Sequence, residues 1–160
     1  MSNGVIDNYL ISQLPSYQLH METIYTFLNV LVMPFWLLML FAPHWQWTKR
    51  IMAPFWSIVL VALLYAGLLL SQIGPMVGIL ANPTLAAIVG ALGQPTGATI
   101  AWAHFLAFDL FVGRWAYLDS REKGITAWIV SPLLFFILMV GPLGFLLYLL
   151  GRTAVLRRRL

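Results

Sequence analysis

The chain has 160 residues, of which 61 % are hydrophobic and only 9 % are charged. With its strongly positive mean hydropathy, this composition excludes a soluble domain, because too few polar groups are present to cover a water-exposed surface. The absence of cysteine excludes disulfides, iron–sulfur ligation and thiolate nucleophiles. The formal charge of +4 does not indicate nucleic-acid binding, because the basic residues lie at the ends of apolar segments and in a short tail.

The first half of the chain contains two apolar segments that are long enough to cross a membrane, which takes about 20 helical residues. Residues 24–42 form the first predicted span, and the tryptophans and cations of residues 45–50 that follow it mark a membrane interface. Residues 55–73 form the second predicted span, which ends at Gly74-Pro75.

The region of residues 76–97 is apolar but carries Asn82-Pro83 and Gln94-Pro95. A continuous membrane helix would have to absorb these pairs as kinks or breaks. We therefore expect a broken or re-entrant segment here, with a regular fifth span as the alternative.

Two further spans are predicted at residues 99–118 and 127–150, and Gly141-Pro142 is expected to kink the second of them. The predicted fold is an all-α integral membrane protein, a bundle of four transmembrane helices with a broken or re-entrant segment between helices 2 and 3. Its orientation stays open. With four spans, the arginines of the tail lie on one side of the membrane and the cations of both connecting segments lie on the other, so the positive-inside rule gives nearly a tie.

The ends of the chain differ from its apolar centre. Residues 1–23 mix polar with apolar side chains and contain no lysine or arginine, so we expect an interfacial segment and no secretory signal. Residues 151–160 form a basic tail with four arginines. The predicted organisation is thus one transmembrane bundle, residues 24–150, with a short segment on either side.

Three ionisable residues within residues 99–118 are the candidates for chemistry, because such a side chain costs about 2.5–3.5 kcal/mol inside a membrane helix and normally has a partner. Asp109 lies near the centre of the span, and Arg114 lies nearer its end. Asp109 could hold helices together or transfer protons, and both interpretations stay open. His104 could ligate the metal of a pigment, but a hydrogen-bonding role is simpler, and no metal site is predicted.

Aromatic side chains accompany these residues. The candidate ligand-binding residues are Trp102, Phe105, Phe108, Phe111 and Trp115. At about 100° per residue, the first two share a face with Asp109, whereas the other three line up with His104. They could form flat walls for an elongated apolar ligand or serve only packing and lipid contact.

Three motifs of the second half resemble a known family: Trp102-Ala-His-Phe-Leu-Ala-Phe-Asp-Leu-Phe-Val-Gly-Arg-Trp115, Ser131-Pro-Leu and Gly141-Pro-Leu-Gly144. They closely resemble the abscisic-acid-deficient-4-like membrane family, and residues 29–43 look like the first helix of that family. The resemblance covers about residues 24–150. Its most specific part is the spacing of His104, Asp109 and Arg114.

The resemblance implies a four-helix membrane protein that handles a carotenoid. Plant relatives are associated with converting violaxanthin to neoxanthin, a reaction that opens an epoxide and forms an allene. An acid near the epoxide oxygen and a base near the departing proton would suit this reaction. We therefore carry over Asp109 and His104 as hypothetical catalytic residues, with Arg114 as an orienting or charge-balancing group.

The predicted function is thus a role in xanthophyll metabolism, as a carotenoid isomerase without a redox cofactor, with the carotenoid as substrate or bound pigment. The alternative is a non-catalytic pigment-binding or lipid-binding subunit of a larger, photosynthetic membrane complex. The expected partners are the lipid bilayer, a carotenoid and other membrane proteins, but no nucleic acid. The expected location is a bacterial inner or photosynthetic membrane.

Overall fold

The computed structural model describes residues 3–157, with side chains from residue 16 onward, and every regular element in this part is an α-helix. In chain order the helices are α1 (Asn3–Phe41), α2 (Gln46–Met52), α3 (Trp56–Ser71), α4 (Ile73–Ala81), α5 (Leu85–Leu92), α6 (Pro95–Glu122), α7 (Ala127–Val140) and α8 (Pro142–Arg157). The predicted all-helical class is confirmed.

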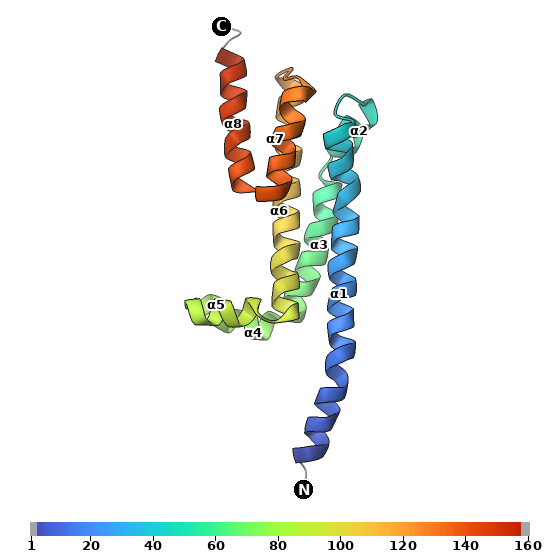
Figure 1. The fold of residues 1–160 in the computed structure, drawn as a ribbon, viewed down its shortest axis with the longest axis vertical. Helices are drawn as coiled ribbons and strands as arrows, with labels where there is room; N and C mark the ends of the chain where they lie inside the picture. Colours follow the sequence, from blue (N-terminus) through green and yellow to red (C-terminus); the bar gives the residue numbers. More distant parts are fainter. Residues whose placement is uncertain (1–2, 158–160) are drawn as a thin grey trace.

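Three long helices form the body of the molecule (Figure 1). Helix α6 packs against both α1 and α3, which also contact each other. Helices α1 and α6 are long and apolar enough to cross a membrane, the first of them over Ser16–Phe41. A third crossing results if α2 and α3, which meet at a bend of 42°, are counted as one broken span.

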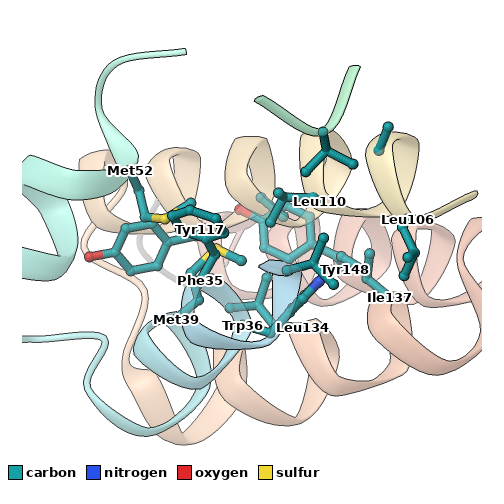
Figure 2. Close-up of a cluster of buried hydrophobic side chains, with 14 of the residues drawn as sticks. Phe35, Trp36, Met39, Met52, Leu106, Leu110, Tyr117, Leu134, Ile137 and Tyr148 are labelled. Atoms are coloured by element: carbon teal, nitrogen blue, oxygen red, sulfur yellow. The ribbon is translucent and has the colours of Figure 1, made fainter. Parts of the chain in front are cut away.

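Buried apolar side chains gather where α6 meets α1, α7 and α8, and Figure 2 shows Trp36, Leu110, Leu134 and Tyr148 among them. Small residues let these helices approach closely, which is the usual basis of packing in membranes. At Gly113 of α6, an added Cβ would lie 2.3 Å from the ring of Trp36. By contrast, α4 and α5 bury no residue.

The segment between α3 and α6 is broken, as the sequence predicts. Helix α4 ends at Ala81 and α5 begins at Leu85, with Asn82-Pro83 between them. The Thr84 hydroxyl caps α5 by accepting a hydrogen bond from a backbone N–H of its first turn. Both helices turn aside from the long ones, and α5 projects sideways from the end of α6 (Figure 1).

The prediction of one kinked span over residues 127–150 is wrong. Helices α7 and α8 pack against each other as an antiparallel hairpin, and the chain reverses at Gly141 (Figure 1). Gly141 has a φ of +40°, which L side chains rarely adopt. The Gly-Pro pair therefore turns the chain back, where the sequence interpretation expected it only to bend a helix.

The hairpin also leaves the predicted count of four membrane helices unconfirmed. Helix α7 has 14 residues and is about 21 Å long, shorter than the apolar core of about 30 Å that a spanning helix must cross. The two arms of the hairpin are in close contact at Gly144, where an added Cβ would lie 2.2 Å from the backbone nitrogen of Ile137 and 2.4 Å from the carbonyl oxygen of Phe136.

Replacing Gly144 with alanine is therefore expected to force the hairpin apart and to lower the thermal unfolding midpoint of the purified protein in detergent. Backbone atoms cannot move aside as a flexible side chain does, and overpacking of this kind costs about 1–3 kcal/mol. The control is Gly67→Ala in α3, where an added Cβ meets no atom within 4 Å. Equal midpoints for the two variants would contradict the close packing of the hairpin.

Candidate functional site

Asp109 lies near the middle of α6, beside the turn that joins α7 to α8. A Cβ built on Gly141 would lie 2.8 Å from Oδ1 of Asp109, so the carboxylate occupies the space that this glycine leaves. Asp109 is half-buried, and within residues 16–157 it makes no hydrogen bond or ion pair. A carboxyl group without such a partner therefore stands at the tip of the hairpin.

Asp109 lies beside two helix ends, the last turn of α7 and the first turn of α8. The carbonyl groups of the last turn of α7 and the N–H groups of the first turn of α8 meet at this turn. Two bonds tighten it, from the Gly141 N–H to the Ile137 carbonyl and from the Phe145 N–H to the Gly141 carbonyl. Pro142, which has no N–H, opens α8. A carboxylate near a helix N-terminus is favoured by about 0.3–1 kcal/mol, so Asp109 can also stabilise the turn itself.

His104 faces a different neighbour, helix α3. Its ring stacks on Phe108 with centroids 4.6 Å apart and meets Tyr65 edge-on at 5.4 Å. It lines two adjoining pockets of about 360 and 380 Å³, the first against α3 and the second against α4 and α5. The other lining residues are apolar except Tyr65, so His104 is the main polar group in this space.

Arg114 is buried, with 6 % of its surface exposed, at the corner between α2 and α3. Its Nε donates to the Met52 carbonyl at 2.5 Å, and its Nη2 donates to the Ala53 carbonyl. The guanidinium lies 4.2 Å from the centre of the Phe55 ring. Since Met52 is the last residue of α2, these contacts fasten α6 to the end of that helix.

The structure thus places the three predicted catalytic residues in three different surroundings. Asp109 lies at the hairpin, His104 in the pockets beside α3, and Arg114 at the α2–α3 corner. It does not bring them together into one site.

The predicted aromatic residues divide in the same way. Trp102 donates from Nε1 to Oδ1 of Asn29 at 3.1 Å and so joins α6 to α1. Trp115 meets two rings of α8. The remaining three, Phe105, Phe108 and Phe111, form what we call the outer face of α6, an exposed side that also lines the pockets beside His104. Phe105 and Phe108 expose 55 % and 58 % of their surface.

Sequence reasoning missed a second polar contact between α6 and the hairpin. Asp119 accepts hydrogen bonds from the Tyr148 hydroxyl at 2.7 Å and from Nε of Arg152 at 2.6 Å. The available signal was the spacing of Tyr148 and Arg152, which are four residues apart and therefore share one helix face. The turn at Gly141 was missed as well, although glycine followed by proline is a common end of a helix.

Apolar helices of membrane-crossing length, with partnered polar residues between them, define the class of an α-helical membrane protein. The model of the family described as ABA DEFICIENT 4-like matches residues 23–148, and the chain belongs to this family, which relates to xanthophyll metabolism in general. The resemblance found in the sequence is thereby confirmed. Neither the curated proteins nor the solved structures gave a match.

The contacts of Arg114 generate a test of its role. Arg114→Met is expected to destabilise the protein by about 1–3 kcal/mol, because it removes the donor to the carbonyls of Ala53 and of the buried Met52. Thermal unfolding in detergent measures this loss. The control Arg50→Met removes an exposed guanidinium that lies over the ring of Trp47 and is expected to change little. If both variants melt together, Arg114 does not hold the corner.

Proposed function

We propose that this protein holds an elongated xanthophyll against the outer face of α6 inside the membrane and that Asp109 acts on one end group of the bound molecule. One observation carries this proposal. A carboxyl group without a hydrogen-bond partner among residues 16–157 lies on the same helix as a run of exposed aromatic side chains, in a family related to xanthophyll metabolism. Such a carboxyl group is costly in lipid, and its retention needs either a structural or a chemical reason.

The proposed binding surface lies between two fixed points of α6. Near one end, Gly97 packs against the backbone of Ala91 in α5, and further along, Asp109 meets the hairpin turn. Twelve residues of helix separate these points, which is about 18 Å. Phe105 and Phe108 are exposed along this stretch and offer flat apolar faces to a conjugated chain.

The pockets beside His104 adjoin this surface and can take up part of such a ligand. Their volumes of about 360 and 380 Å³ lie in the range of pockets that bury small molecules. A neutral imidazole can donate one hydrogen bond and accept another, so His104 can bind a polar group of a ligand. We therefore assign His104 to ligand binding, apart from the reacting end.

Because His104 and Asp109 have different surroundings, we assign the proton transfers of the reaction to Asp109. Opening an epoxide to an allenic alcohol breaks one C–O and one C–H bond, and it forms an O–H bond and a C=C bond without net oxidation. A protonated carboxyl group can give its proton to the epoxide oxygen, and the resulting carboxylate can take the proton that leaves carbon. Asp109 alone can perform both transfers, and the isomerisation then needs no redox cofactor.

A non-catalytic pigment-binding subunit is the second candidate. It is favoured by the position of Asp109 near the N-terminus of α8, where a carboxylate stabilises the hairpin without any reaction.

Asp109→Asn is expected to lower the conversion of an added epoxy-xanthophyll by about 10²-fold or more, because the amide keeps the shape but loses the proton transfer. Turnover and the thermal midpoint of purified variants are measured together. A folded Asn variant that reacts like the parent contradicts the catalytic role. Retention of pigment by parent and variant, without turnover by either, supports the non-catalytic subunit.

Phe108→Ala is expected to weaken retention of the xanthophyll about 3- to 10-fold, because an aromatic contact contributes about 0.5–1.5 kcal/mol beyond its buried area. The matched control is Phe136→Ala on α7, a phenylalanine of similar exposure outside the proposed surface. Bound pigment is quantified by absorbance after purification. If both variants lose pigment equally, the outer face of α6 is not the binding surface.

The proposal also includes a membrane arrangement, with three crossings formed by α1, α2–α3 and α6, and a re-entrant hairpin formed by α7 and α8. It is supported by the contact of Arg152 with Asp119, which brings the end of α8 to the end of α6. A four-span bundle would instead need α7 and α8 to open into one helix and would carry the C-terminus to the opposite side.

Single introduced cysteines can distinguish these arrangements, because the chain has no cysteine of its own that would react with the labelling reagent. Thr153→Cys is expected to react with a membrane-impermeant reagent from the same side as Glu122→Cys and from the side opposite to Asn82→Cys. Labelling of Thr153→Cys together with Asn82→Cys would establish the four-span bundle instead.

A further inference from the structure

The cations of the described chain gather at one end of the molecule, apart from the buried Arg114. They lie on α2, around the connection from α6 to α7 and on the second half of α8, which share one end in Figure 1. The residues are Lys49, Arg50, Arg121, Lys123, Arg152 and Arg157. Helices α4 and α5, at the other end, carry no charged residue.

The hairpin returns the C-terminal helix to the end that carries the other cations. With this distribution, the positive-inside rule no longer gives nearly a tie. Basic residues concentrated at one membrane face favour the cytoplasmic side, where anionic lipids give the surface a negative potential. In the membrane arrangement proposed above, the basic end faces anionic headgroups.

A pocket of about 590 Å³ opens at this basic end, between the last turn of α1 and the first turns of α7. Its walls are mostly apolar, and Phe41 and Trp128 line it while exposing 80 % and 93 % of their surface. Ser131, also in the wall, donates its hydroxyl to the Leu40 carbonyl at 2.9 Å. Large apolar side chains this exposed beside cations are typical of the membrane–water interface.

The rim of the pocket carries two polar groups in contact. His44 lines the pocket, and Nη1 of Arg121 lies 2.7 Å from its Nδ1. Since an arginine can only donate, Nδ1 accepts, and the neutral imidazole then carries its own proton on Nε2. Among residues 16–157 no carboxylate forms an ion pair with Arg121. The rim thus offers a positive charge and a second N–H donor beside an apolar space.

We propose that this pocket binds one anionic phospholipid of the leaflet at the basic end. An acyl chain lies between Phe41 and Trp128, and the phosphate accepts hydrogen bonds from Arg121 and His44. Charge complementarity favours an anionic phospholipid. A guanidinium forms strong paired hydrogen bonds with phosphate oxygens, and the negative net charge of the headgroup complements the surrounding cations.

The test compares the binding of phosphatidylglycerol and phosphatidylcholine with identical acyl chains to the purified full chain, by native mass spectrometry and by the rise in thermal midpoint. Phosphatidylglycerol is expected to bind about tenfold more tightly, and Arg121→Gln is expected to remove that preference. The control Arg50→Gln removes an exposed cation at the same end that lies over the ring of Trp47, and it is expected to keep the preference.

A second variant tests the apolar part of the site without changing any charge. Ala127 lines the pocket, so Ala127→Phe is expected to occupy the space of the acyl chain and to weaken phosphatidylglycerol binding about tenfold. Equal binding of both lipids by the parent chain overturns the proposal. So does an equal loss of preference in Arg121→Gln and Arg50→Gln, which would indicate a general charge effect, or unchanged binding by Ala127→Phe.

Discussion

Backbone N–H and C=O groups at the end of a helix need partners, and two helix ends meet at the turn between α7 and α8. The chain meets this need with a glycine at positive φ, a proline that has no N–H to satisfy, and two backbone hydrogen bonds across the turn. The carboxylate of Asp109 lies against the same turn. The tip of the hairpin thus lies against the central helix.

Helix α6 connects the other elements because three of its side chains bond to three different neighbours. Trp102 bonds to α1, Arg114 bonds to the end of α2, and Asp119 bonds to α8. Each hydrogen bond between membrane helices contributes about 0.6 kcal/mol on average, so no single bond determines the fold. Their distribution along the helix fixes its rotation and depth relative to three partners at once.

Much of this architecture could be predicted from the sequence. Composition gave the membrane class, and Asn82-Pro83 marked the break between α4 and α5. Helical periodicity placed His104 and Asp109 on different faces, and they do have different neighbours. These conclusions depend only on local geometry, which a sequence contains.

The parts that the sequence did not show depend on contacts between distant residues. A kink and a reversal have the same Gly-Pro signal, and the difference is decided by Gly144 against the backbone of α7 and by Arg152 reaching Asp119. Arg114 was expected to orient a ligand or balance a charge. Its carbonyl partners lie 61 and 62 residues earlier in the chain, and no local pattern identifies them.

The partners of α6 are not all synthesised before it. When α6 leaves the ribosome, the α2 carbonyls that receive Arg114 already exist, whereas the hairpin beside Asp109 and the cation for Asp119 do not. Until α7 and α8 follow, Asp109 lacks the hairpin turn and Asp119 lacks its cation, and an ionisable side chain without a partner is costly in lipid. A chain interrupted before α8 lacks the ion pair between Arg152 and Asp119, so α6 is then without one of its contacts to the rest of the fold.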